Sequence, residues 1–284
     1  MININDLPGY DDAAPLLAVD NLCVTFESFE GEVAAVDGVS FTVNPGETLC
    51  IVGESGSGKS ASQMAILGLL STPPAMISGS VRFCGIELVH APQSTLFTVR
   101  GSGVSMIFQD AITSLNPSLK VGFQIAEVFC ARTGSDRASG RKYAIELMER
   151  VAIPDASHRV DDYPFQFSGG MCQRIMIAMA LALNPKILIA DEPTTALDVT
   201  VQRQVMELLK SLSKNADLAL VLITHDLGVA AEQADKVMVM YAGRTVETGL
   251  TDAVFAKPYH PYTQALLSSM PDVTNNFNRL GIIN

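Results

Sequence analysis

The stretch IVGESGSGKSASQ, residues 51–63, decides the fold of this 284-residue chain. It begins in a short apolar run, passes through a glycine-rich turn, and ends in a segment with helical spacing. Its central part, GESGSGKS, fits the pattern G-x-x-x-x-G-K-[ST], which connects a strand to a helix and surrounds nucleotide phosphates. A flexible turn without a ligand is the alternative, but lysine and serine in register favour phosphate binding. We therefore expect a nucleoside triphosphate here.

Each position in this stretch has a physical role. The glycines allow successive backbone N–H groups to turn toward phosphate oxygens, and the following helix directs its positive end to the same place. The lysine would reach the β and γ phosphates, and the last serine would coordinate Mg2+. The residues that we expect to contact the nucleotide are Gly53, Ser55, Gly56, Gly58, Lys59 and Ser60, followed by Ala61.

Composition limits the classes of function. The chain has 30 acidic and 19 basic residues, a net charge of -11, which argues against a broad nucleic-acid surface. Its five cysteines lack metal-ligand spacing, which indicates reduced thiols. The first residues do not resemble a signal peptide, and no apolar run approaches the roughly 18 residues of a membrane span. We therefore expect the chain itself to lie in the cytosol.

The order of strand and helix signals predicts an α/β fold. Short segments rich in β-branched residues between 16 and 51 predict an antiparallel β region that leads into a buried strand. Residues 60–71 have helical spacing and precede two prolines. Residues from about 120 to 160 are mostly helical in pattern. From 185 onward, strands and helices alternate as they do in a parallel sheet.

Two further clusters accompany the glycine-rich loop. An apolar strand ends in Asp191 and Glu192, where one carboxylate can hold Mg2+ and the other can activate a water molecule. Ser168 can cap a long helix whose first residues are Gly169 and Gly170, which makes a second anion-binding helix end. For Asp191 and Glu192 the alternative is a solvated acidic cap at the strand end. For the Ser168 segment the alternative is an ordinary capped core helix. Because the loop already surrounds one side of the phosphates, the second helix end suits a nucleotide held by another subunit.

Taken together, these motifs resemble those of the ATP-binding cassette (ABC) ATPases. GESGSGKS corresponds to Walker A and ILIADEP to Walker B. FSGGM, at 167–171, corresponds to the signature sequence, and ALD, at 196–198, to the D-loop. The resemblance implies catalytic roles for Glu192, for Gln109 near the metal and attacking water, and for His225 at the γ phosphate. It also implies that Phe26 stacks on adenine, although a core role for this apolar strand residue stays open.

The resemblance also implies an architecture. We expect a P-loop NTPase core with a mainly parallel sheet, an N-terminal antiparallel β subdomain and an inserted helical subdomain. The expected boundaries are an N-terminal extension at 1–15, the ABC ATPase domain at 16–255 and a C-terminal extension at 256–284. Within the ATPase domain, the helical subdomain would span about 110–180.

Several segments narrow the resemblance to the peptide and nickel importer ATPases of bacteria. The selective segments are SLNP at 114–117 and HPYT at 260–263. The chain departs from that family at Cys172, where arginine is frequent. It also ends before the cysteine-bearing tail of many longer relatives, so we expect no iron–sulfur cluster.

This resemblance implies a peripheral subunit on the cytoplasmic face of the cell membrane that hydrolyses ATP with Mg2+ to drive import of oligopeptides or dipeptides. The implied partners are two transmembrane permease subunits, a second ABC ATPase subunit of the same or a related chain, and an extracytoplasmic substrate-binding protein. No nucleic-acid partner is expected. A nickel importer ATPase, an exporter ATPase and a soluble nucleic-acid-associated ABC ATPase are the alternatives.

Overall fold

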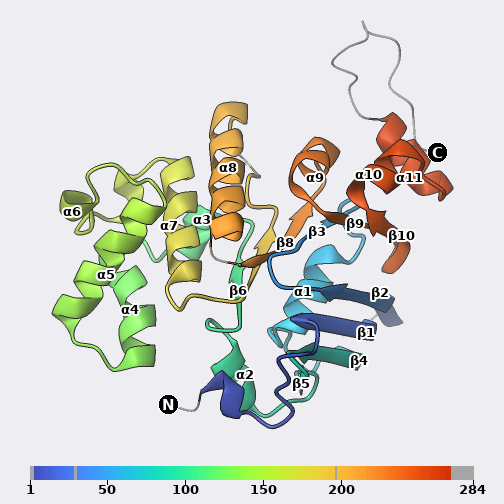
Figure 1. Cartoon of the computed structure of the whole chain (residues 1–284), viewed down its shortest axis with the longest axis horizontal. Coiled ribbons are helices and arrows are strands. Elements are labelled where there is room, and N and C mark those ends of the chain that lie inside the picture. Colours follow the sequence, from blue (N-terminus) through green and yellow to red (C-terminus); the bar gives the residue numbers. More distant parts are fainter. Residues whose placement is uncertain (1–2, 29–30, 196, 216, 270–284) are drawn as a thin grey trace, which may run out of the picture.

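The computed structural model describes residues 3–28, 31–195, 197–215 and 217–269. Its central element is a six-stranded sheet, in which only β9 and β10 pair in antiparallel fashion (Figure 1). The strand order is β10 (Arg244–Leu250), β9 (Lys236–Tyr241), β3 (Thr48–Val52), β8 (Ala219–Thr224), β7 (Ile187–Asp191) and β6 (Val104–Ile107). The predicted α/β class with a mainly parallel sheet is thereby confirmed.

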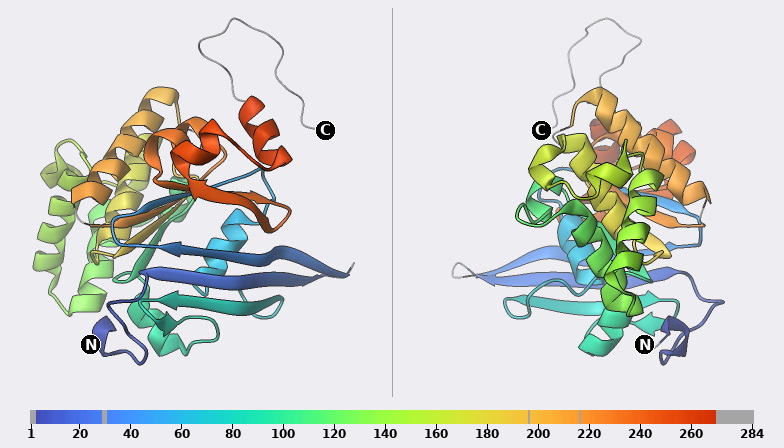
Figure 2. Two further views of the ribbon diagram at one scale, coloured as in Figure 1. Left: turned by 45° about the vertical axis from the view of Figure 1, so that its right-hand side comes forward. Right: turned by 90° about the vertical axis from the view of Figure 1, so that its left-hand side faces the viewer.

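A second sheet covers one side of the central sheet. It is antiparallel and has the order β2 (Gly31–Val43), β1 (Leu17–Ser28), β4 (Ala75–Phe83) and β5 (Ile86–Glu87). Helix α1 (Lys59–Ile66) lies between the two sheets (Figure 2). Leu17 of β1, Ile66 of α1 and Ile189 of β7 belong to one buried cluster. This cluster joins the antiparallel sheet to the central one, and the predicted N-terminal β region is confirmed.

The opposite face of the central sheet is covered by helices. These are α7 (Gly169–Leu181), α8 (Val199–Asn215) and α9 (Leu227–Gln233), with α3 (Ala111–Ser114) in contact with α7. Helices α4 (Val121–Thr133), α5 (Arg137–Arg150) and α6 (Ala156–Arg159) gather beyond α7. Strand β3 contributes to both cores, because Leu49 and Ile51 face the antiparallel sheet while Cys50 and Val52 face the helices. Such alternation is expected of a parallel strand that is buried on both faces.

The sequence pattern was wrong about the end of the first helix. We expected it to reach Ser71, but α1 ends at Ile66. Gly68 adopts a φ of 61°, a left-handed conformation that ends a helix. The sequence pattern also missed β6, the short helix α2 (Gln93–Val99) and the short helix α10 (Thr251–Ala256).

Parts of three predicted segments lie outside the described residues. These parts are residues 1–2 of the expected N-terminal extension, Ala196 of the expected D-loop and residues 270–284 of the expected C-terminal extension. The domain boundaries proposed from the sequence stay predictions. Nevertheless, α3 to α7 fill most of the range expected for the helical subdomain.

The central sheet determines where the candidate site lies. Strands β3, β6, β7 and β8 are mutually parallel, so their carboxyl ends share one edge. Ligands in open α/β sheets bind at that edge. The glycine-rich loop follows β3, Gln109 follows β6, Glu192 follows β7 and His225 follows β8. Segments that are far apart in the sequence therefore meet at one place.

Candidate nucleotide-binding site

The phosphate-binding loop, residues 53–58, joins β3 to α1. Gly58 caps α1 with a φ of 95°, which favours glycine. A Cβ on Gly58 would lie 2.2 Å from the carbonyl oxygen of Ala35, and one on Gly53 would lie 2.3 Å from that of Met240. Backbone from β2 and β9 therefore approaches this loop so closely that only glycine fits at both positions.

Lys59 is the first residue of α1 and points back into the loop. Its Nζ donates hydrogen bonds to the carbonyl oxygens of Gly53 and Glu54, at 2.8 Å each, and lies 3.3 Å from Oγ of Ser57. The side chain is only 5% exposed. Burial lowers the pKa of Lys59, while nearby carboxylates oppose that shift. The ammonium group is thus fixed at the centre of the loop by backbone oxygens.

Asp191 ends β7 and is 6% exposed. Burial raises the pKa of its carboxyl group, the charge of Glu192 adds to this shift, and a hydrogen bond from Ser60 together with the charge of Lys59 opposes it. Oδ1 of Asp191 is buried without a hydrogen-bond partner among the described residues. A buried carboxylate oxygen beside a serine hydroxyl is a donor set that suits Mg2+.

Glu192 receives contacts from three elements. Nε2 of Gln109 donates to its Oε2 at 3.0 Å, the hydroxyl of Thr195 donates to the same oxygen at 2.9 Å, and Nδ1 of His225 lies 3.5 Å away. The Glu192 side chain is 18% exposed, so water can reach it, whereas His225 is 66% exposed. A partly accessible carboxylate held by two donors can accept a proton from a water molecule.

The backbone of Glu192 is also unusual. Its φ of 45° is left-handed, and its N–H donates to the carbonyl oxygen of Ile223 at 2.9 Å. Non-glycine residues in this region cost free energy and concentrate at functional sites. The structure thus brings together three residues that the sequence predicted, namely Glu192, Gln109 and His225. Sequence reasoning missed Thr195, which lies in the turn after the strand, where only the fold reveals its contact.

The other residues that we expected to contact the nucleotide lie in the loop, at the start of α1 and in β1. Ser55 and Gly56 are exposed in the loop, and Gly56 has a φ of 80° with open space at its Cβ position. Ala61 carries a methyl group, so only its backbone can contact a phosphate. Phe26 lies in β1, and its ring packs partly buried against the core between the two sheets. Its contact with adenine stays a prediction.

The signature segment starts α7. Ser168 is its N-cap, and the hydroxyl accepts the N–H of Met171 at 3.4 Å. A Cβ on Gly170 would lie 2.4 Å from Cγ1 of Val201 on α8, whereas one on Gly169 would lie 3.8 Å from its nearest neighbour, in Leu197. Close packing on α8 therefore requires glycine at 170, a role that the sequence did not reveal.

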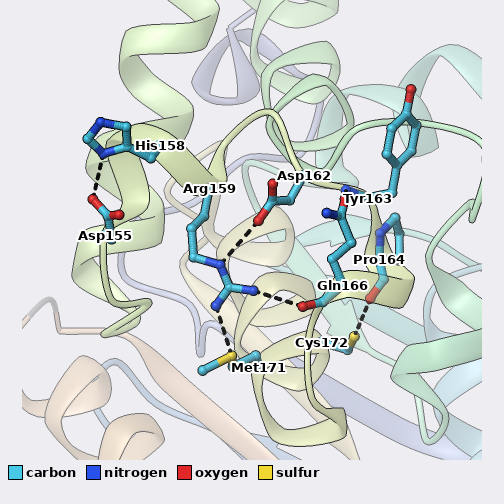
Figure 3. A network of polar contacts seen from close by, with 9 residues as sticks. All are labelled: Asp155, His158, Arg159, Asp162, Tyr163, Pro164, Gln166, Met171 and Cys172. Carbon is cyan, nitrogen blue, oxygen red and sulfur yellow. Dashed lines mark hydrogen bonds and ion pairs between the residues drawn. The ribbon is translucent and has the colours of Figure 1, made fainter.

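Arg159 fixes the chain that leads into α7 (Figure 3). Its guanidinium donates to Oδ2 of Asp162 at 3.2 Å and to the carbonyl oxygen of Gln166 at 2.9 Å, and lies 3.2 Å from Sδ of Met171. The same group stacks 4.0 Å from the ring centre of Phe167. One half-buried cation thus orders the approach to the signature helix.

Cys172 faces inward from the first turn of α7 (Figure 3). The thiol is 3% exposed and donates to the carbonyl oxygen of Pro164 at 3.5 Å. Burial raises the pKa of this thiol. Cys172, where the resemblance led us to expect arginine, therefore packs into the buried cluster of the helical part.

Helix α7, which the signature segment begins, belongs to the helical part of the chain. Helix α1, which the phosphate-binding loop begins, lies between the two sheets (Figures 1 and 2). The chain therefore carries two glycine-rich helix ends that could face phosphates, placed in different parts of the fold.

Comparisons with known proteins agree with this geometry. Residues 36–195 match the family model described as ABC transporter. Residues 246–283 match the model described as oligopeptide/dipeptide transporter, C-terminal region. The first match covers the phosphate-binding loop, the signature helix and the strand-end acids, and the second covers the HPYT segment.

Two curated relatives extend over most of the chain. The oligopeptide transport ATP-binding protein OppD of Bacillus subtilis is 52% identical over 262 residues, which are 92% of this chain and 73% of that protein. The dipeptide transport ATP-binding protein DppD of Escherichia coli is 51% identical over 265 residues, 93% of this chain and 81% of that protein.

A solved structure shares the fold. It is the dimeric post-hydrolysis state of an ATP-binding cassette bound to ADP and Pi, with 28% identity and a TM-score of 0.73 over 83% of this chain and 98% of that one. Sequence, structure and family models thus agree, and the chain belongs to the ABC transporter family as one of its ATP-binding, ATP-hydrolysing subunits.

Proposed function

We propose that this chain is the ATPase subunit of an ABC importer for oligopeptides or dipeptides. The observation that carries the catalytic part is the arrangement of Gln109, Thr195 and His225 around the Glu192 carboxylate, at the sheet edge that holds the phosphate-binding loop. The assignment of peptides as the transported substrate is supported by the names of relatives that match over nine tenths of the chain. The C-terminal family match supports the same substrate class.

Ser60 and Asp191 are the residues that would hold Mg2+. Oδ1 of Asp191, which is buried and has no hydrogen-bond partner among the residues that the structure describes, and the adjacent Ser60 hydroxyl fit such an ion. When bound, Mg2+ reduces the charge on the β and γ phosphates. Lys59 supplies a second positive charge, and loop carbonyls already hold its ammonium group in place.

Glu192 would accept the proton of the attacking water. Gln109 and Thr195 both donate to one carboxylate oxygen, Oε2, and so orient the group. The other oxygen can then face the water molecule. His225, exposed at the neighbouring strand end, would contact the γ phosphate. This assignment separates ground-state binding by Lys59 from proton transfer by Glu192.

Two cassettes would act together. The exposed Ser168 begins a helix in a different part of the fold from α1, which suits a nucleotide held by the loop of a second subunit. The related cassette was solved as a dimer. We infer an assembly of two ATPase subunits on two permease subunits, supplied with peptide by an extracytoplasmic binding protein.

The membrane would be reached through these partners. No helix in the described ranges is both long and apolar enough to cross a bilayer. Peripheral attachment to permeases at the cytoplasmic face is consistent with that finding. Nickel import and nucleic-acid processing are not favoured, because the relatives reported above are named for peptide transport.

Reconstitution tests this proposal. The chain is purified with the membrane subunits that accompany it and placed in vesicles together with the co-purifying binding protein. ATP should drive accumulation of labelled di- or oligopeptides, and the Lys59→Ala complex serves as the inactive control. Accumulation of Ni2+ instead of peptide, or ATP hydrolysis that responds to nucleic acid, would overturn it.

A further inference from the structure

The HPYT segment, which the nucleotide site does not account for, is anchored firmly to the central sheet. It starts α11 (Pro261–Ser268), and His260 caps that helix by accepting the N–H of Tyr262 at Nδ1, 3.1 Å away. The carboxylate of Glu247, on β10, accepts the N–H groups of Tyr259 and His260 at 2.8 and 3.0 Å. The first turn of α11 therefore has a fixed position relative to the sheet.

This anchoring directs Tyr262 toward the phosphate-binding loop. Tyr262 is 8% exposed, and its ring centre lies 4.6 Å from that of Tyr241, the last residue of β9. Its hydroxyl accepts a hydrogen bond from the N–H of Glu54 at 3.2 Å, across 208 positions of sequence. Burial raises the pKa of Tyr262, so the hydroxyl stays protonated and neutral at physiological pH.

The accepted N–H belongs to the same peptide unit as the carbonyl group of Gly53. That carbonyl oxygen accepts the hydrogen bond from Nζ of Lys59. In a trans peptide the C=O and N–H point in opposite directions. Tyr262 and Lys59 therefore hold one planar unit from its two sides. If the hydroxyl is removed, rotation of this unit also displaces the oxygen that binds Lys59.

Other contacts also restrain this segment, since the carbonyl oxygen of Glu54 accepts hydrogen bonds from Nζ of Lys59 at 2.8 Å and from the N–H of Ser57 at 3.2 Å, but neither of them acts on the N–H of Glu54. The carbonyl oxygen of Met240 lies so near Gly53 that no side chain fits there. Glu54 is itself exposed and offers no packing. The Tyr262 hydroxyl is thus a specific, directional contact at the entrance of the loop.

We propose that Tyr262 is a positioning residue for ATP binding, which fixes the Gly53–Glu54 peptide and through it the ammonium group of Lys59. The inference rests on the proposed nucleotide function of this loop. It gives the C-terminal family region a physical task, because α11 stabilises the loop of the ATPase region in its phosphate-binding conformation.

The Tyr262→Phe variant removes the hydroxyl and keeps the ring. A hydrogen bond contributes about 0.5–1.5 kcal/mol, so we expect the Kd of a fluorescent ATP analogue to rise about two- to tenfold. The kcat at saturating ATP should stay within about twofold, because the lost contact acts on ground-state binding. The matched control is Tyr241→Phe, which removes the hydroxyl of the partner ring. That hydroxyl has no hydrogen-bond partner in the part of the chain that the structure describes, so Kd should not change.

Hydrogen exchange of the full chain separates positioning from general loss of stability. Without nucleotide, Tyr262→Phe should speed exchange in a peptide covering residues 53–58 and leave a peptide covering 187–191 unchanged. A Kd equal to wild type, or faster exchange in both peptides, would overturn the inference. Failure of the wild-type chain to bind ATP would instead refute the proposed function, so the two outcomes are distinguishable.

Discussion

A methyl group added at Gly170 tests the close contact between α7 and α8. A Cβ there would lie 2.4 Å from Cγ1 of Val201, whereas carbon atoms in contact lie about 3.5–4.0 Å apart. In a helix, valine strongly prefers one rotamer, so the methyl group cannot turn away freely. Overpacking of this kind costs about 1–3 kcal/mol. Replacing a helical glycine returns at most about 1 kcal/mol.

We therefore expect Gly170→Ala to lower the free energy of unfolding by about 1–2 kcal/mol. For a chain of this size each kcal/mol corresponds to roughly 2–4 °C in Tm. Thermal and urea unfolding of the purified, nucleotide-free chain measure the change. Gly169→Ala is the matched control, because its Cβ would meet its nearest neighbour at an ordinary 3.8 Å, so this change should leave the stability equal or slightly raise it.

A double-mutant cycle makes the test sharper. In a Val201→Ala background the obstructing methyl group is absent, so Gly170→Ala should become neutral or slightly stabilising. Such a change of sign isolates the contact between the two side chains. Equal effects of Gly170→Ala in both backgrounds would refute our reason for glycine at this position.

Further predictions concern the metal ligand and the signature helix. Burial raises the pKa of Asp191, so its charge destabilises the folded chain above that pKa and has no effect below about pH 4, where the group is protonated in both states. Asp191→Asn should therefore raise Tm at pH 7.5 and raise it less as the pH falls toward 4.5; an unchanged Tm at pH 7.5 would contradict the stability argument. The same substitution should abolish the Mg2+ dependence of ATP binding. In the assembled complex, Ser168→Arg should leave ATP binding by the chain's own loop intact but prevent nucleotide-driven cross-linking between cassettes. A loss of affinity as large as that of Lys59→Ala in the isolated chain would mean that the helix binds in cis.

Local patterns were sufficient to predict the parts of the site that depend on neighbouring residues. A buried strand, a glycine-rich turn and a lysine are contiguous, so the loop before Lys59 was predictable. Asp191 and Glu192 follow an apolar strand directly, and the parallel order of strands brings them to the same edge. The family resemblance then identified Gln109 and His225, which have no local signal of their own.

Contacts between distant segments were not predictable in this way. Tyr262 meets Glu54 across 208 positions, and no periodicity reports such a distance. The need for glycine at 170 depends on how α8 packs against α7. Thr195 contacts Glu192 within one turn, but a threonine after a strand is too common a pattern to indicate a role.

We propose that Glu192 drives ATP hydrolysis at a site where nucleotide binding depends on Lys59. The most direct measurement compares ATP hydrolysis and ATP binding by reconstituted wild-type, Glu192→Gln and Lys59→Ala complexes. We expect Glu192→Gln to bind ATP normally and to hydrolyse it at least about 100-fold more slowly, which corresponds to a barrier increase of about 2.7 kcal/mol or more. Lys59→Ala should instead bind ATP poorly. Hydrolysis by the Glu192→Gln complex at close to the wild-type rate would contradict the role of Glu192 in proton transfer.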